Sequence, residues 1–158
     1  MVSLKQSLKS FLQKLDNKSR SIYFLTQGCC SIEVDNLCSS NYDLQRLGYT
    51  IDIDDPREAT VLIVSGWINP AFAEKIKEVY SQISGDKAVI AVGACSISKS
   101  PYVDENGLKL TDVLPVDIYV PGCPPRPEAI IEAIRLLEKT KENRETSKII
   151  YGAIRELG

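Results

Sequence analysis

The sequence predicts an α/β domain built on a mostly parallel β-sheet with helices on both faces. Short runs rich in valine and isoleucine alternate along the chain with segments whose apolar residues recur at helical spacing. Such alternation of strands and helices is typical of parallel connections. Several of the runs are apolar throughout, which indicates strands that are covered on both faces.

Five segments are expected to be strands, and the last two along the chain are the clearest. The runs at 87–92 and 116–120 consist largely of valine, isoleucine and alanine, without an alternating polar face. The expected strands are 21–25, 49–53, 59–65, 87–92 and 116–120.

Four further segments are expected to be helices. The segment 70–83 begins at a proline and is followed by Gly85, and these residues favour the two ends of a helix. The segment 127–140 also begins at a proline and carries alanine, isoleucine and leucine along one side. The remaining helices are expected at 31–40 and 147–156.

The first 20 residues form a segment with a basic amphipathic pattern. Over residues 3–16, leucine and phenylalanine recur at helical spacing, and lysines occupy other positions. Such an N-terminal amphipathic helix can lie on a membrane surface or on a partner protein, and it can equally pack on its own domain. We therefore expect an interface segment at 1–20 and a single α/β domain at 21–158.

Composition narrows the classes of function. The chain has 158 residues, 44% hydrophobic and 25% charged, and its net charge of −2 lacks the basic excess of a nucleic-acid-binding domain. The absence of histidine from the sequence excludes Ser–His and Cys–His nucleophilic catalysis and metal sites that use imidazole. No apolar run approaches the roughly 18 residues that span a bilayer, and the N-terminus lacks a secretory pattern. We expect a soluble, cytoplasmic protein.

Four cysteines lie in loops that follow predicted strands. Cys29 and Cys30 follow the first strand, Cys95 the fourth and Cys123 the fifth. Because ligands of such folds bind beyond the carboxyl ends of the strands, the four thiols can share one site. Thiolates are the ligands of four-iron clusters, and a proline after the last cysteine, here Pro124, is a familiar feature of such sites. The pattern favours an iron–sulfur protein that moves electrons.

The cysteine pattern is also compatible with three alternatives. A structural zinc ion takes four thiolates too, although two adjacent ligands on one small tetrahedral ion would be strained. A redox-active disulfide between Cys29 and Cys30, or simple buried cysteines, are the second and third alternatives. FMN is disfavoured because the first strand-to-helix loop carries this cysteine pair instead of a Ser/Thr-rich turn. The fifth cysteine, Cys38, is expected to be a small buried hydrophobic side chain.

Several blocks of the chain resemble one protein family. They are the Gly-Cys-Cys-Ser-Ile-Glu stretch at 28–33, the segments 41–48, 55–59 and 61–66, the Gly-Ala-Cys stretch at 93–95, and the proline-rich segment 115–129. In this order they are similar to the cluster-carrying 20 kDa small subunit of NADH:quinone oxidoreductase (complex I), whose family includes the small subunits of [NiFe]-hydrogenases. The adjacent cysteines resemble the complex I-like branch.

The resemblance implies a flavodoxin-like fold with one [4Fe–4S] cluster held by Cys29, Cys30, Cys95 and Cys123. In the family this is the terminal cluster of an electron-transfer chain. The resemblance therefore implies a non-autonomous subunit of a respiratory-type, membrane-associated oxidoreductase complex. Its cluster would pass electrons to a quinone or a related acceptor at the interface with a large, hydrogenase-like subunit of the 49 kDa type.

The same resemblance implies a ferredoxin-like iron–sulfur subunit and membrane subunits as further partners, and a peripheral position on the cytoplasmic side of the cell membrane. No nucleic acid is expected as a partner, because the net charge of −2 lacks a basic excess. The alternative is the small subunit of a membrane-bound energy-converting [NiFe] hydrogenase or of a sulfur-reducing complex. The short loop at 96–114 and Trp67 depart from the complex I pattern on the expected acceptor side. These departures leave the identity of the electron acceptor open between a quinone and the alternatives.

Two charged positions have alternative interpretations. The resemblance places Arg57 near the cluster, where a cation would favour the reduced state. Alternatively, Arg57 is a surface side chain paired with Asp54 or Asp55. Asp43 and Arg46 are three residues apart and are expected to form a structural ion pair.

Overall fold

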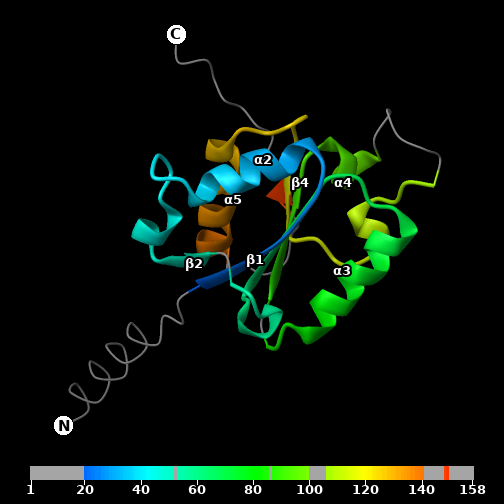
Figure 1. The fold of residues 1–158 in the computed structure, drawn as a ribbon, viewed down its shortest axis with the longest axis horizontal. Helices are drawn as coiled ribbons and strands as arrows, with labels where there is room; N and C mark the ends of the chain where they lie inside the picture. Colours follow the sequence, from blue (N-terminus) through cyan, green and yellow to red (C-terminus); the bar gives the residue numbers. More distant parts are fainter. Residues whose placement is uncertain (1–19, 52, 86, 100–105, 141–147, 150–158) are drawn as a thin grey trace.

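The computed structural model of the protein describes residues 20–51, 53–85, 87–99, 106–140 and 148–149. Within this part of the chain, parallel strands form one six-stranded sheet in the order β2-β1-β3-β4-β5-β6 (Figure 1). The order of the first five is that of flavodoxin. The predicted flavodoxin-like α/β fold is confirmed, whereas the amphipathic helix expected at 3–16 lies outside the described residues.

The strands coincide with the apolar runs of the sequence. They are β1 (Arg20–Thr26), β2 (Tyr49–Ile51), β3 (Val61–Ser65), β4 (Ala88–Val92), β5 (Ile118–Val120) and β6 (Lys148–Ile149). β3 is buried at all five positions, as expected for a central strand covered on both faces.

The last strand corrects a prediction. A helix was expected at 147–156, but 148–149 form β6, which pairs with β5 in parallel through Ile118 and Tyr119. The pairing comes from a strand distant in sequence, and such tertiary context overrides a weak local pattern. The rest of the expected helix lies outside the described residues.

Four α-helices and four 3₁₀ turns connect the strands in the described part of the chain. The α-helices are α2 (Cys29–Asp35), α3 (Pro70–Gln82), α4 (Ala94–Ser98) and α5 (Pro127–Thr140). The 3₁₀ turns are η1 (Asn36–Cys38), η2 (Leu44–Leu47), η3 (Pro56–Glu58) and η4 (Leu110–Asp112). The helix expected at 31–40 is thus divided between α2 and η1, and the short α4 was not predicted.

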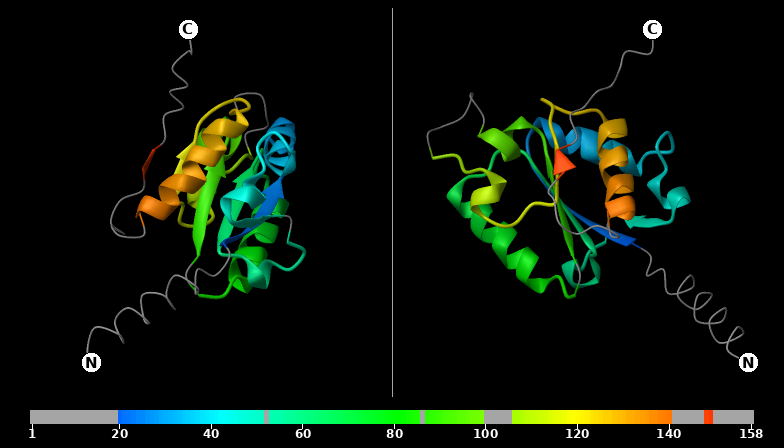
Figure 2. Two further views of the ribbon diagram at one scale, coloured as in Figure 1. Left: turned by 90° about the vertical axis from the view of Figure 1, so that its left-hand side faces the viewer. Right: turned by 180° about the vertical axis from the view of Figure 1, so that it is seen from behind.

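The helices cover both faces of the sheet, as the sequence indicated. On one face Val34 of α2 and Ile130 of α5 pack with Ile63 and Val92 of the sheet. On the other face Ile76 of α3 belongs to a second buried cluster, with neighbouring strand residues that point the opposite way. Figures 1 and 2 show α2 and α5 on one side of the strands and α3 on the other.

The parallel register aligns the ends of four strands. Thr26 of β1 pairs with Ser65 of β3, Ser65 pairs with Val92 of β4, and Val92 pairs with Val120 of β5. These residues form one continuous row across the sheet, and we call it the terminal row. Each of them is the last residue of its strand, so the loops that follow leave the sheet at the same edge.

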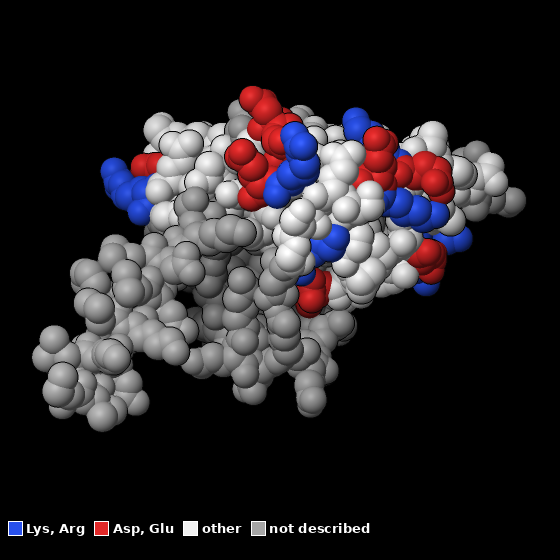
Figure 3. Space-filling model, turned by 90° about the horizontal axis from the view of Figure 1, so that it is seen from below, with Lys and Arg blue, Asp and Glu red and all other residues white. Residues whose placement is uncertain are grey.

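The opposite edge of the sheet is an ordinary charged surface. Acidic and basic side chains lie next to one another on the face seen from below in Figure 3. The two charges are interspersed there, which is typical of a solvated protein surface. In the part of the chain described, no helix has both the length and the apolar character that crossing a membrane requires.

Helix α3 is fixed at both ends by side chains. Asn69 precedes the helix, and its Oδ1 atom accepts a hydrogen bond of 2.7 Å from the backbone N–H of Phe72. At the other end, Lys87 donates to the carbonyls of Tyr80 and Ile83 and lies 3.8 Å from the centre of the Tyr80 ring. These bonds satisfy backbone groups that the helix itself leaves unpaired.

Replacing the N-terminal cap of α3 should weaken the fold measurably. Asn69→Ala removes the bond to Phe72, and we expect the free energy of unfolding to fall by about 1 kcal/mol in guanidinium chloride titrations followed by circular dichroism. Asn69→Ser keeps a capping oxygen and should remain near the wild-type value. Equal stability of Asn69→Ala and wild type would show that the cap contributes nothing.

Candidate functional site

The four predicted ligand cysteines leave the sheet at the edge defined by the terminal row. Cys29, Cys95 and Cys123 each lie three residues beyond the row member of their own strand, and Cys30 follows Cys29 directly. Cys29 and Cys30 begin α2, Cys95 lies in α4, and Cys123 lies in the loop before α5. The side chain of Cys30 is buried, Cys95 is half-buried, and Cys29 and Cys123 are exposed.

Backbone hydrogen bonds join these loops to one another. The N–H of Gly93 donates to the carbonyl of Val120 at 2.9 Å, and the N–H of Ala94 donates to the carbonyl of Gly122 at 2.8 Å. The loop that carries Cys95 is therefore bonded to the loop that carries Cys123.

The loop after β1 is held in the same manner. The N–H of Gln27 donates to the carbonyl of Ser65 at 3.2 Å, and its side-chain amide donates to the carbonyl of Trp67. The first turn of α2 is closed by Ser31, whose hydroxyl donates to the carbonyl of Gly28 at 2.7 Å. Each cysteine loop is thus positioned by bonds of the main chain as well as by its strand.

Cys30 interacts with each of the other three cysteines. Burial, the adjacent Cys29 and, to a smaller extent, the charges of Cys95 and Cys123 together raise the pKa of the Cys30 thiol to about 12. Cys95 and Cys123 therefore lie near enough to Cys30 for their charges to affect its thiol. The thiol of Cys30 remains protonated at neutral pH unless a cation compensates its negative charge.

Gly93 provides space for the Cys30 sulfur. Its φ of 89° lies in the region that favours glycine, and a Cβ atom added there would lie only 2.5 Å from the Sγ of Cys30. The end of β4 and the sulfur of Cys30 therefore approach as closely as a residue without a side chain permits.

Not every predicted feature of the cysteines is found. Cys38 was expected to be buried, but it is exposed, and Leu37 is the buried residue of η1. In the described residues, no three cysteine, aspartate or glutamate side chains are grouped closely enough to hold a single metal ion.

Two buried polar atoms at the same edge were not predicted. The hydroxyl of Ser65 and the indole nitrogen of Trp67 have no hydrogen-bond partner in the part of the chain that the structure describes. Sequence patterns could not reveal them, because an unpaired atom is recognised only from its three-dimensional neighbours.

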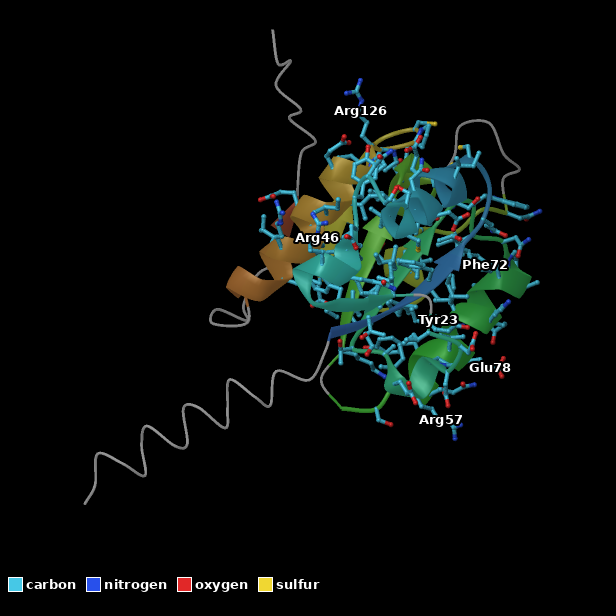
Figure 4. The ribbon with its side chains drawn as sticks, turned by 60° about the vertical axis from the view of Figure 1, so that its left-hand side comes forward. Tyr23, Arg46, Arg57, Phe72, Glu78 and Arg126 are labelled. Atoms are coloured by element: carbon cyan, nitrogen blue, oxygen red, sulfur yellow. The ribbon has the colours of Figure 1, made fainter. Side chains whose placement is uncertain are left out.

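The charged positions divide into one confirmed pair and one correction. Asp43 and Arg46 form the predicted ion pair at 3.4 Å. Arg57 lies in η3, before β3, and is therefore at the edge opposite the cysteines, with Arg126 at the other end of the molecule (Figure 4). The guanidinium of Arg57 donates hydrogen bonds to both carboxylate oxygens of Asp55, with a shortest distance of 2.7 Å. The surface pairing is confirmed, and the expected position near the cluster is wrong.

A further polar group lies beside the cysteine loops. The hydroxyl of Tyr42 donates to Oε1 of Glu128, at the start of α5, at 3.0 Å. This bond and the charge of Glu128 and Glu33 raise the pKa of Tyr42, whereas Arg126 lowers it. Because Tyr42 and Glu128 are 86 positions apart, no local pattern predicted that they would meet.

Comparison with known proteins gives consistent matches. The family described as NADH ubiquinone oxidoreductase, 20 Kd subunit, matches residues 28–137, more than half of the chain. The B subunit of the NADH-quinone oxidoreductase of Clostridium beijerinckii is 41% identical over 137 residues, which cover 81% of this chain and 81% of that protein. The corresponding protein of Rubrobacter xylanophilus is 43% identical over 119 residues, which cover 74% of this chain. The match spans 47% of the Rubrobacter protein, so this chain corresponds to about half of its length.

One similar solved structure belongs to a different complex. A chain in the membrane-bound sulfane sulfur reductase, an archaeal respiratory membrane complex, superposes with a TM-score of 0.73 and 32% sequence identity. The superposition covers 87% of this chain and 78% of that one. The fold is therefore shared over most of this chain.

The burial of Cys30 should be visible in its chemistry. In the metal-free, reduced protein at pH 8, we expect iodoacetamide to alkylate Cys30 more than about tenfold more slowly than Cys29 or Cys123, since the thiolate is the reacting species. Peptide mass spectrometry measures the rates, and the guanidinium-unfolded chain, in which all cysteines should react alike, is the control. Similar rates for Cys29 and Cys30 in the folded chain would contradict the burial of Cys30.

Filling the space at Gly93 should displace the Cys30 sulfur. We expect Gly93→Ala to fold but to bind little iron and sulfide when it is reconstituted anaerobically, because the new methyl group occupies the place of Sγ. Gly85→Ala is the matched control: its φ is 77°, yet its Cβ would meet nothing within 4 Å. It should lose about 1–2 kcal/mol of stability to backbone strain and keep full binding. Equal binding by both variants would refute the close contact.

Proposed function

Because the chain belongs to the family of the 20 kDa subunit of NADH:ubiquinone oxidoreductase, we propose that it is an electron-transfer subunit of a membrane-associated oxidoreductase complex. In this proposal one [4Fe–4S] cluster is held by Cys29, Cys30, Cys95 and Cys123. The observation that carries the proposal is that four cysteines from three distant loops leave the sheet at the same edge, where the sulfur of Cys30 lies against Gly93 at the end of β4.

The residues present fit such a cluster. All four donors are thiols, the ligands that four-iron clusters take, and the two adjacent cysteines can bind separate iron atoms. Gly93 leaves room for the sulfur of Cys30. The raised pKa of Cys30 also fits, because the mutual repulsion of clustered thiolates is relieved by a positively charged iron centre. When bound, such a cluster takes up and releases one electron at a time.

The chain itself makes the proposed cluster site rigid and shields one side of it from solvent. Cys30 is 2% exposed and lies against the end of the sheet. The loop that carries Cys123 contains prolines at 121, 124, 125 and 127, and each proline ring fixes its own φ. A stiff surrounding suits electron transfer, because little has to rearrange when the charge of the site changes.

The outer side of the site is where partners would bind. Cys29 and Cys123 are exposed, and Ile32, on the first turns of α2, is a large apolar side chain with 64% exposure. In the proposal a large, hydrogenase-like subunit covers this side and contributes the acceptor pocket. A ferredoxin-like subunit would deliver the electrons, and membrane subunits would hold the complex on the cytoplasmic side of the membrane, with residues 1–20 as an interface segment.

The acceptor in the proposal is a quinone or a related compound. The similarity to the sulfane sulfur reductase chain, at 32% identity, favours a sulfur compound as the second candidate. The complex purified in detergent from native membranes decides between them, since it should reduce either a soluble quinone analogue or a polysulfide. Activity with neither acceptor would count against both candidates.

The ligand assignment predicts the behaviour of single cysteine variants. Anaerobically prepared wild-type protein should contain about four iron atoms and four sulfides per chain and show a paramagnetic signal after reduction. Replacement of Cys29, Cys30, Cys95 or Cys123 by alanine should reduce the iron content to below about one atom, because a four-iron cluster needs all its thiolates. Iron and acid-labile sulfide analysis with EPR spectroscopy makes the measurement.

The fifth cysteine serves as the control in this series. Cys38→Ala removes an exposed cysteine of the same chain, and it should keep the iron, the sulfide and the EPR signal of the wild type. A colourless wild-type protein that contains only zinc would contradict the proposed function as a whole.

A further inference from the structure

The buried hydroxyl of Ser65 has no hydrogen-bond partner in the described part of the chain. Ser65 is the last residue of β3 and is 0% exposed, and its Oγ atom has no partner among the described residues. A buried hydroxyl without a partner is unfavourable, because it has given up its hydrogen bonds to water. Alanine would fill the same position without that cost. The hydroxyl therefore points to an acceptor that is not part of the polypeptide.

The register shows which face of the sheet carries this hydroxyl. Ser65 pairs with Val92, and residues paired side by side in parallel strands direct their side chains to the same face. Val92 belongs to the buried cluster that α2 and α5 cover, together with Val34 of α2. The side chain of Ser65 thus lies on the face covered by α2, the helix whose buried residues are Cys30 and Val34.

The same register places Ser65 between the cysteine loops. Its neighbours in the terminal row are Thr26, which leads to the cysteine pair, and Val92, which leads to Cys95. The residue after Val92 is Gly93, and the Cys30 sulfur lies in the space that a side chain at this position would occupy. The unpaired hydroxyl and the most buried thiol therefore lie at the same end and on the same face of the sheet.

We propose that the Ser65 hydroxyl donates a hydrogen bond to a sulfur atom of the [4Fe–4S] cluster and thereby stabilises its reduced state. This inference rests on the proposed function. Reduction adds negative charge to the cluster and its sulfurs, and a donated hydrogen bond stabilises that charge, so such bonds raise the reduction potential. The effect is larger at a buried position, where water does not screen it. Ser65 holds no iron and acts only through this bond.

The test compares two buried serines at the same edge of the sheet. Ser65→Ala removes the unpaired hydroxyl, whereas Ser96→Ala removes one that already donates to the carbonyls of Val92 at 2.9 Å and Gly93 at 3.0 Å. Both residues are 0% exposed. The full-length chain is reconstituted with iron and sulfide under anaerobic conditions, and its reduction potential is measured by titration followed by EPR.

We expect Ser65→Ala to lower the potential and Ser96→Ala to leave it unchanged. At a fixed potential the ratio of reduced to oxidised cluster should fall about three- to tenfold, which corresponds to roughly 30–60 mV for a one-electron couple. In deuterated buffer, pulsed EPR of the reduced cluster should lose one exchangeable deuteron in Ser65→Ala. The metal-free Ser65→Ala chain should be at least as stable as the wild type, because the hydroxyl makes no hydrogen bond to the described residues that the substitution could remove.

Several results would overturn the inference. An unchanged potential and deuteron signal in Ser65→Ala would show that the hydroxyl binds only an internal water molecule. An equal shift in Ser96→Ala would show a general effect of removing a hydroxyl. If Ser65→Ala loses its cluster, Ser65→Thr and Ser65→Val form a pair of equal size that differs in the hydroxyl, and equal potentials would refute the bond. A wild-type chain without a cluster refutes the proposed function instead, so the two failures are distinguishable.

Discussion

The parallel register of the four central strands is the constraint on which the site depends. Thr26, Ser65, Val92 and Val120 pair in one row, so every loop that follows starts from the same level of the sheet. Cysteines three residues beyond the row therefore leave the sheet at the same edge, even though they are far apart in the sequence. A shift of one strand by a single residue would turn its side chains to the opposite face and disperse the thiols.

Backbone hydrogen bonds between the loops position the cysteines more closely than the strand register alone. The bonds from Gly93 and Ala94 to the loop after β5 fix two of the cysteine segments against each other. Helix α2 then brings Cys30 onto the face of the sheet where Gly93 leaves space for its sulfur. The position of the most buried thiol therefore depends on a helix, a strand end and a missing side chain, and each lies in a different part of the sequence.

Much of this arrangement could be predicted from the sequence, because it depends on local composition. The valine- and isoleucine-rich runs predicted five strands, and the position of the cysteines after those runs predicted a shared edge. The burial of Cys38 and the structure at 148–149 were predicted wrongly, because both depend on tertiary neighbours. Arg57 shows the same limit, since its local partner Asp55 was foreseen but its distance from the cysteines was not. The unpaired hydroxyl of Ser65 needed the register, which no sequence pattern specifies.

Two buried groups at this edge of the sheet lack compensation within the described part of the chain. The buried thiol of Cys30 resists ionisation, and the buried hydroxyl of Ser65 has no acceptor within the described chain. A centre that accepts a hydrogen bond and carries positive charge on its iron atoms would relieve both. Anything that binds the folded chain and not the unfolded one stabilises the fold. In the proposed function, the groups that lack compensation within the polypeptide are therefore those that a cluster would stabilise, and they lie together at one end of the sheet.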